Sequence, residues 1–236
     1  MFISEILHPY KVEEFKDKYL NKDICVWKAP IGAADRYKSL YSWEKFESFL
    51  NNYDQIKNIQ IAGIGMDGEP DKGKDKWDKG RGCKLTRDDI YFMWRAGHTI
   101  VLPFSEYQSL HLWSIVNLLE SQFGSGQCNM YCSSGGDSFT FKPHVDGTDN
   151  FLFHIEGNVR WDFFKDVDGV RKRIKTMTLG SGDLLYIPIG LYHKASTLTP
   201  RLTASVHFNP KNKENLSRPK MRDWYRWFDY HRSIKL

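Results

Sequence analysis

Short runs of alternating apolar and polar residues fill the second half of the chain, and glycines separate many of these runs. Alternation with period two is the pattern of a β-strand that buries one face. A series of short strands spaced about ten residues apart is typical of a sandwich or barrel. We therefore predict a mainly β fold, with strands at 127–133, 138–146, 150–157, 159–165, 173–179, 183–188 and 202–208.

The first half of the chain has a different pattern, in which apolar residues recur every three or four positions. This spacing predicts helices that flank the β region, at 12–20, 42–52, 85–97 and 105–124. Two short apolar runs predict strands at 24–30 and 98–103. The glycine- and charge-rich segment 65–82 is expected to be an exposed loop. We expect one domain over residues 1–210 and a short helical tail over residues 211–236.

Composition places the chain among globular proteins, because 41% of its 236 residues are hydrophobic. The net charge of +5 comes without any Lys/Arg run longer than the RKR at 171–173. A mildly basic, solvated surface is therefore favoured over a nucleic-acid footprint, although a nucleic-acid partner is not excluded. Four scattered cysteines predict reduced thiols, and no stretch is apolar enough to span a membrane. We expect a cytoplasmic protein without a membrane partner.

His144 and Asp146 lie two residues apart in the segment KPHVDGTDNF. Such residues share a face when they lie on a strand, so both side chains can point into one pocket. His193 ends the run GDLLYIPIGLYH, in which Pro188 and Gly190 mark the end of a buried strand. Two imidazoles and one carboxylate form the facial triad of non-haem iron(II) oxygenases. These three residues are predicted to bind a metal, and the alternative is a purely structural role.

The same residues carry a resemblance to a known family. HVDGTDNFLFHIEGNVRW followed by LGSGDLLYIPIGLYHKA resembles the Jumonji C subgroup of 2-oxoglutarate oxygenases, and within it the ribosomal-oxygenase type. Upstream, GHTIVLP, a helix ending in FG and then NMYCSSGG follow the order of that subgroup. The resemblance covers roughly residues 20–210, and the family's later dimerisation region and winged-helix domain are not visible.

The resemblance implies a double-stranded β-helix, the jelly-roll barrel of the cupin superfamily. It also implies that His144, Asp146 and His193 hold Fe(II), that 2-oxoglutarate is the cosubstrate, and that dioxygen is the oxidant. Asn129 and Tyr131 match the family's strand whose polar residues face the cosubstrate pocket. The implied activity is hydroxylation of a side chain in a protein, with ribosomal proteins among the candidate substrates.

One position departs from the family. Relatives usually place a lysine or arginine where this chain has Val159, and that cation pairs with the distal carboxylate of 2-oxoglutarate. Burying this carboxylate without a partner would cost several kcal/mol, so another cation must bind it. Lys142 shares the parity of the first metal histidine, and Arg201 precedes Thr203 and Ser205 on the last predicted strand. Arg201 is our first choice.

Two alternatives stay open at this point. The chain is either a 2-oxoglutarate-dependent hydroxylase, or a cupin-like metal-binding protein or oxygenase that acts on a small molecule or RNA base without the usual anchor. At least one of Tyr131, Phe151 and Trp161 is expected to line the pocket, and ordinary core packing is the alternative for each. The oligomeric state does not follow from the sequence.

Overall fold

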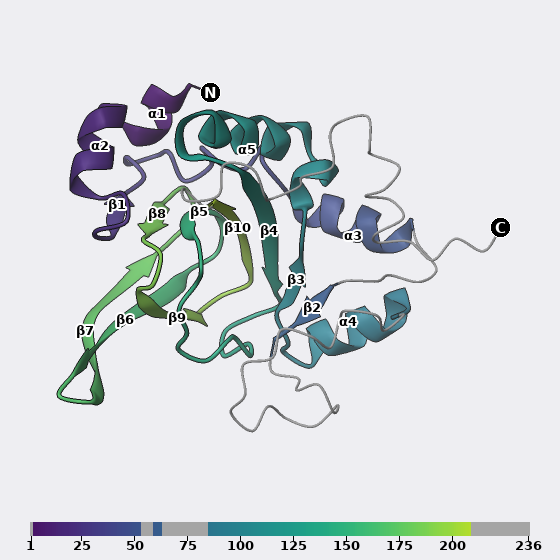
Figure 1. The fold of residues 1–236 in the computed structure, drawn as a ribbon. Coiled ribbons are helices and arrows are strands. Elements are labelled where there is room, and N and C mark those ends of the chain that lie inside the picture. Colours follow the sequence, from purple (N-terminus) through teal and green to yellow (C-terminus); the bar gives the residue numbers. More distant parts are fainter. Residues whose placement is uncertain (1, 53–58, 63–84, 209–236) are drawn as a thin grey trace.

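Two antiparallel β-sheets form the centre of the computed structural model, which describes residues 2–52, 59–62 and 85–208 (Figure 1). The larger sheet has seven strands in the order β1-β8-β5-β10-β4-β3-β2. Its strands are β1 (Cys25–Trp27), β2 (Gln60–Ile61), β3 (Ile100–Leu102), β4 (Gly126–Ser133), β5 (Asp149–Glu156), β8 (Leu184–Ile187) and β10 (Arg201–Phe208). The smaller sheet has the order β7-β6-β9. Its strands are β6 (Val159–Val167), β7 (Val170–Leu179) and β9 (Tyr192–Thr197).

Helices flank the larger sheet, with α5 running across its upper end in Figure 1. The α-helices of the described residues are α1 (Ile3–Leu7), α2 (Val12–Lys18), α3 (Trp43–Asn51), α4 (Arg87–Arg95) and α5 (Leu110–Phe123), and the 3₁₀ helix η1 spans Ser105–Gln108. Local sequence sets several of their ends. Thr86 and Asp89 form a capping box at the start of α4, and Gly124, with φ of 105°, ends α5.

An aromatic cluster joins the N-terminal helices to the larger sheet. Phe15 of α2 packs edge-on against Tyr186 of β8, with ring centroids 4.9 Å apart, and also contacts Phe151 of β5 at 5.5 Å. Phe123 at the end of α5 lies 5.6 Å from the same Phe151 ring. Burying such rings removes a large apolar area from water, so this cluster fixes the outer face of the sheet whose inner face carries the site.

The structure confirms the mainly β fold with flanking helices and the double-stranded β-helix that the resemblance implied. Three details were wrong. Segment 138–146 is not a strand, because it makes only isolated bridges at Phe139 and His144. The single helix predicted over 105–124 is interrupted at Ser109, whose extended backbone separates η1 from α5. The strand β9 was not predicted.

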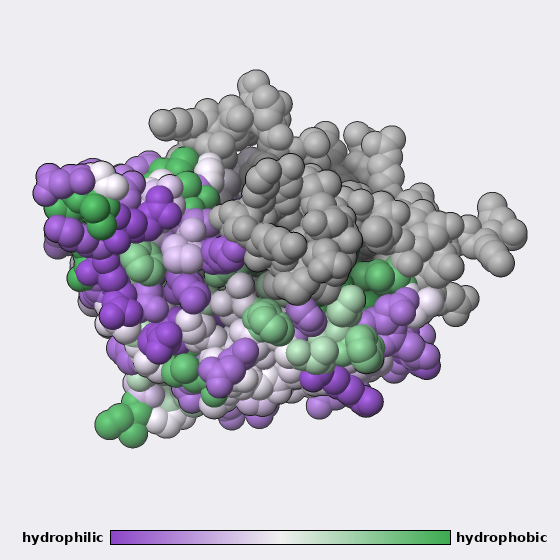
Figure 2. Space-filling model, turned by 90° about the horizontal axis from the view of Figure 1, so that it is seen from below, coloured by the Kyte–Doolittle hydropathy of each residue, from purple (hydrophilic) through white to green (hydrophobic). Residues whose placement is uncertain are grey.

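Two sequence-based expectations, the loop at 65–82 and the helical tail at 211–236, fall outside the described residues. The domain boundary near residue 210 therefore stays a prediction. In the part of the chain that the structure describes, no helix is both long and apolar enough to cross a membrane. Hydrophilic residues cover most of the coloured surface in Figure 2, and the hydrophobic residues on that face form small separate groups.

Candidate metal centre

A two-residue backbone bridge brings the predicted histidines together. The amide N–H of His144 donates to the carbonyl of His193 at 3.1 Å, and the amide of His193 donates back to His144 at 2.9 Å. This reciprocal pair aligns the end of the 138–146 segment with the beginning of β9, so both imidazoles extend from adjacent backbone positions. The ring centroids lie 4.6 Å apart.

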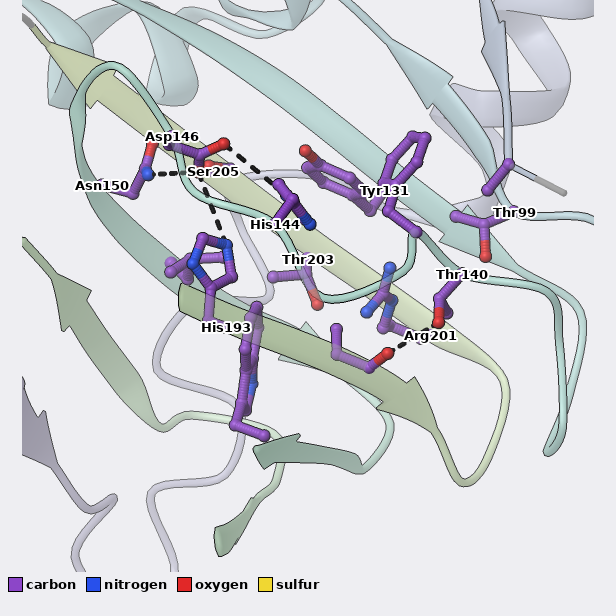
Figure 3. A pocket seen from close by; sticks show the side chains of 15 residues that line it. Thr99, Tyr131, Thr140, His144, Asp146, Asn150, His193, Arg201, Thr203 and Ser205 are labelled. Atoms are coloured by element: carbon purple, nitrogen blue, oxygen red, sulfur yellow. Dashed lines mark hydrogen bonds and ion pairs between the residues drawn. The ribbon is translucent and has the colours of Figure 1, made fainter. Parts of the chain in front are cut away.

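Asp146 completes the cluster from the same irregular segment. Its Oδ1 lies 3.6 Å from Nε2 of His144, and its Oδ2 lies 3.5 Å from Nε2 of His193. One ligand atom from each of the three residues lies within 4.8 Å of the others, and their side chains point toward one another in Figure 3. The amide N–H of Gly190 donates to the Asp146 carbonyl at 3.1 Å and ties this segment to the turn before β9.

Hydrogen bonds orient all three candidate ligands. Nδ1 of His144 donates to the Lys142 carbonyl at 2.7 Å, and Nδ1 of His193 donates to the Leu191 carbonyl at 2.9 Å. A carbonyl only accepts, so Nδ1 carries the proton and the Nε2 lone pair of each neutral ring is available to an ion. Burial lowers the pKa of His193 and so favours its neutral, metal-binding form.

Asn150, the second residue of β5, acts on the carboxylate in the same way. Its side-chain amide donates to Oδ2 of Asp146 at 2.6 Å, which fixes the orientation of that group. We did not predict this residue from the sequence. Asn150 lies two residues before Leu152 and shares its face of the strand, and Leu152 also lines the pocket. This spacing could have identified Asn150 from the sequence.

The triad opens into a pocket between the two sheets, and Arg201 lies at the other end of this pocket beyond Thr203 (Figure 3). Arg201 is 3% exposed, and its Nε has no hydrogen-bond partner among the described residues. Its guanidinium carbon lies 5.4 Å from the centre of the Tyr131 ring. Burial lowers the pKa of Arg201 to about 10, so the side chain stays a cation at neutral pH.

A second unsatisfied group lies beside this arginine. The Thr203 hydroxyl is buried without a hydrogen-bond partner in the described structure. Arg201, Thr203 and Ser205 follow one another along the inner face of β10, with about 6.8 Å between successive residues on that face. Burying a cationic N–H group and a hydroxyl without hydrogen-bond partners is costly, and an anionic ligand would satisfy both.

The other predicted residues divide between the pocket and its surroundings. Tyr131 lines the pocket, whereas Asn129 is buried outside its lining and pairs in register with Ser205. Lys142 is exposed and does not line the pocket. Val159, at the position where relatives usually have a lysine or arginine, is fully buried and supplies no cation.

The expectation for the aromatic residues is confirmed, because Tyr131 and Trp161 both line the pocket. The Trp161 ring lies 6.0 Å from that of His193. Phe151 takes the alternative role and packs in the outer aromatic cluster. The indole N–H of Trp161 donates to Nε2 of the fully buried His154 at 3.0 Å, and this second contact was also not predicted.

The donor set fits an iron(II) ion, since two neutral imidazoles and one carboxylate on one side leave the remaining positions open. The Nε of Arg201 and the Thr203 hydroxyl, which have no hydrogen-bond partners in the described structure, fit the far end of a dicarboxylate that reaches the same ion. Fold and site together define a double-stranded β-helix of the cupin type with a candidate metal site.

Comparison with known proteins shows similarity to one family of oxygenases. Residues 103–216 match the family model described as the JmjC domain. Ribosomal oxygenase 1 of Danio rerio is 26% identical over 82% of this chain and 37% of its own length. Ribosomal oxygenase 2 of Rattus norvegicus is 28% identical over 97% of this chain and 49% of its own length. Residues 103–216 are thus similar to a JmjC domain, and the proteins similar to most of the chain are ribosomal oxygenases.

Solved structures agree with the fold. The ribosomal oxygenase YcfD from Escherichia coli, solved in complex with cobalt and 2-oxoglutarate, superposes with a TM-score of 0.59 at 15% identity. That match covers 94% of this chain and 55% of the YcfD chain. The chain spans less than half the length of the relatives from Danio rerio and Rattus norvegicus.

Proposed function

We propose that this protein is an Fe(II)- and 2-oxoglutarate-dependent oxygenase that hydroxylates a side chain of a protein substrate. The observation that carries the proposal is a pocket with a two-histidine, one-aspartate cluster at one end and, at the other, a buried arginine whose Nε has no hydrogen-bond partner among the described residues. A metal-binding barrel needs only the cluster. The arginine adds the requirement for an anion, and a dicarboxylate cosubstrate meets it.

The polar residues at the two ends of the pocket have separate roles in this proposal. His144, Asp146 and His193 hold the ion, with both imidazoles fixed by backbone carbonyls. Arg201 binds the distal carboxylate of 2-oxoglutarate through parallel N–H donors, and the Thr203 hydroxyl donates to it as well. When bound, iron and cosubstrate supply the chemistry in which dioxygen is consumed, 2-oxoglutarate loses carbon dioxide to give succinate, and one oxygen atom enters a substrate C–H bond.

The aromatic wall excludes water from this reaction. Trp161 and Tyr131 cover apolar area on two sides of the pocket, and the low dielectric strengthens the interaction between Arg201 and a carboxylate. Leu152 adds a third apolar surface from β5. These residues position the cosubstrate and leave the ion side open toward the substrate.

The substrate class is proposed from the relatives. Two are called ribosomal oxygenases, and a third, from Dictyostelium discoideum, is called a bifunctional lysine-specific demethylase and histidyl-hydroxylase. These names support a protein substrate, with a ribosomal protein as the first candidate. Cytoplasmic location remains a prediction of the sequence.

Succinate formation tests the proposal. The purified chain with Fe(II), ascorbate and 2-oxoglutarate should form succinate slowly without substrate and faster with a ribosomal protein fraction, in which mass spectrometry should detect a gain of one oxygen atom. His144→Ala should remove this turnover while the circular dichroism spectrum is retained. Metal binding without either 2-oxoglutarate binding or succinate formation would instead support the cupin-like alternative.

A further inference from the structure

The strands β6 and β7 extend beyond the rest of the smaller sheet. The last pair between β6 and β9 is Phe164 with Tyr192, whereas β6 and β7 remain paired as far as Val167 and Val170. The outer part of this hairpin therefore lies on no third strand, and it projects from the molecule at the lower left of Figure 1. We call the pair of strands from 159 to 179 the β6–β7 ribbon.

On one face of the ribbon, each arginine lies beside an aspartate. Asp162 lies 3.5 Å from Nε of Arg160 and 3.6 Å from a guanidinium nitrogen of Arg173. Asp166 lies 3.4 Å from Nε of Arg171, whose guanidinium also stacks over the Tyr192 ring. Register places these charged residues on one face, because paired residues share a face and alternate residues return to it.

The opposite face carries lysines and no carboxylate. The register pairs Phe163 with both Lys175 and His193, so these three residues form one row across β7, β6 and β9. The row is two strand spacings wide, or about 10 Å, which places Lys175 near a candidate metal ligand. Further along the same face, Lys165 lies directly opposite Lys172. Each of these three lysines is exposed.

Nothing in the described part of the fold neutralises this lysine face. No carboxylate of the described residues forms an ion pair with Lys165, Lys172 or Lys175. Like charges directly opposite each other on a two-stranded ribbon are destabilising, so the pair of Lys165 and Lys172 opposes folding of the hairpin. An extended polyanion along the ribbon would remove this repulsion.

We propose that the lysine face of the β6–β7 ribbon binds the phosphodiester backbone of RNA next to the metal-site pocket. The inference rests on the proposed function, because a ribosomal protein substrate is embedded in RNA. Lysine ammonium groups bind phosphates as point charges, so a row of exposed lysines fits the spaced charges of a phosphodiester backbone. The ribbon's arginines lie on the other face beside aspartates, so the cations of the ribbon that lack an ion-pair partner among the described residues are these lysines.

Binding of a fluorescein-labelled oligouridine to the full chain tests this inference. The variant with Lys165, Lys172 and Lys175 all changed to Ala should bind at least about tenfold more weakly at low salt, and its slope of log K against log salt should be smaller by about 2, since each single-strand phosphate contact contributes about 0.7. The matched control changes three exposed lysines elsewhere, Lys11, Lys18 and Lys38, to Ala and should bind like the wild type.

A single variant separates charge recognition from loss of structure. Lys165→Glu places opposite charges across the ribbon at Lys172, so it should stabilise the hairpin while weakening RNA binding. Equal losses in the ribbon and control variants would overturn the proposal, as would unchanged binding in both. Preference for a labelled polyglutamate over RNA would assign the face to an acidic peptide instead.

Succinate formation without substrate, measured on the same variants, separates this inference from the proposed function. The ribbon variants should keep the wild-type rate, because none of the three lysines lines the pocket. A chain that binds RNA through the ribbon but forms no succinate would refute the proposed function alone. A chain that forms succinate with RNA binding independent of the ribbon would refute this inference alone.

Discussion

Replacing Arg201 by Met isolates the role of the buried cation, because Met keeps most of the side-chain length and removes the charge. Arg201 is 3% exposed, and its Nε has no hydrogen-bond partner among the described residues. Removing one partner of a buried, hydrogen-bonded charge pair costs about 2–5 kcal/mol. The affinity for 2-oxoglutarate should therefore fall by a factor between about 30 and about 4,000, since each 1.4 kcal/mol corresponds to tenfold.

The protein without cosubstrate should respond in the opposite direction. Arg201 then remains a desolvated cation with no carboxylate near it in the described structure, and an apolar side chain of similar size avoids that cost. Arg201→Met should raise the free energy of unfolding by an amount on the order of 1–4 kcal/mol. A residue that only supports the fold would lower stability when it is replaced.

Calorimetric titration with 2-oxoglutarate under anaerobic conditions, with Mn(II) in place of iron, measures the first effect, and urea unfolding measures the second. Metal affinity should stay within about twofold of the wild type, because Arg201 belongs to the opposite end of the pocket. Lys142→Met is the matched control, since Lys142 is an exposed cation outside the pocket lining. An unchanged affinity for 2-oxoglutarate in Arg201→Met would refute the assignment of the anchor.

Three further predictions concern the ion and its surroundings. Asp146→Ala should lower Mn(II) affinity by at least about tenfold in a fluorescence titration, because it removes the only anionic ligand of the cluster. Asn150→Ala should lower metal affinity by about 10- to 100-fold through loss of the 2.6 Å hydrogen bond, and Asn150→Ser should recover part of it. Burial lowers the pKa of His154 from 6.5 to about 4, so protonation favours the unfolded state and stability should fall as pH drops from 6.5 toward 4. Urea unfolding at pH 7.5 and 5 should show a smaller decline for His154→Gln than for the wild type.

Sequence patterns predicted the strands and helices that bury one continuous apolar face. They were less reliable where contacts between loops determine the backbone conformation. The strand β10 was predicted almost to the residue, because its inward residues alternate with core residues over its whole length. The metal segment was placed on a strand for the same reason, yet Asp146 lies in an irregular segment held by backbone contacts with the turn at Gly190. Such contacts join positions 44 residues apart and leave no periodic signal.

The candidate site was predictable to a different extent at its two ends. At the candidate metal end, two histidines and an aspartate that lie together in one pocket have few roles other than binding a metal. His144 and His193 were therefore identified, although the strand predicted around His144 was wrong. The proposed cosubstrate end depends on which cation faces inward. Parity left both Lys142 and Arg201 as candidates, and Arg201 was preferred for its guanidinium and for the Thr203 and Ser205 that follow it. The structure separates them, because the segment around Lys142 is not a strand and its side chain is exposed.

The apolar residue at position 159 and the arginine at position 201 follow from the same electrostatic constraint, which is that a buried charge needs a partner. Val159 is fully buried in the second hydrophobic cluster, beside Leu179, its register partner on β7. A cation there would be desolvated without a partner from that cluster, and a second positive charge in the same barrel would also repel the guanidinium on β10. One distal carboxylate can neutralise only one of them. With the cation on β10, an apolar residue at 159 is therefore the arrangement that leaves no buried charge unpaired once a dicarboxylate is bound.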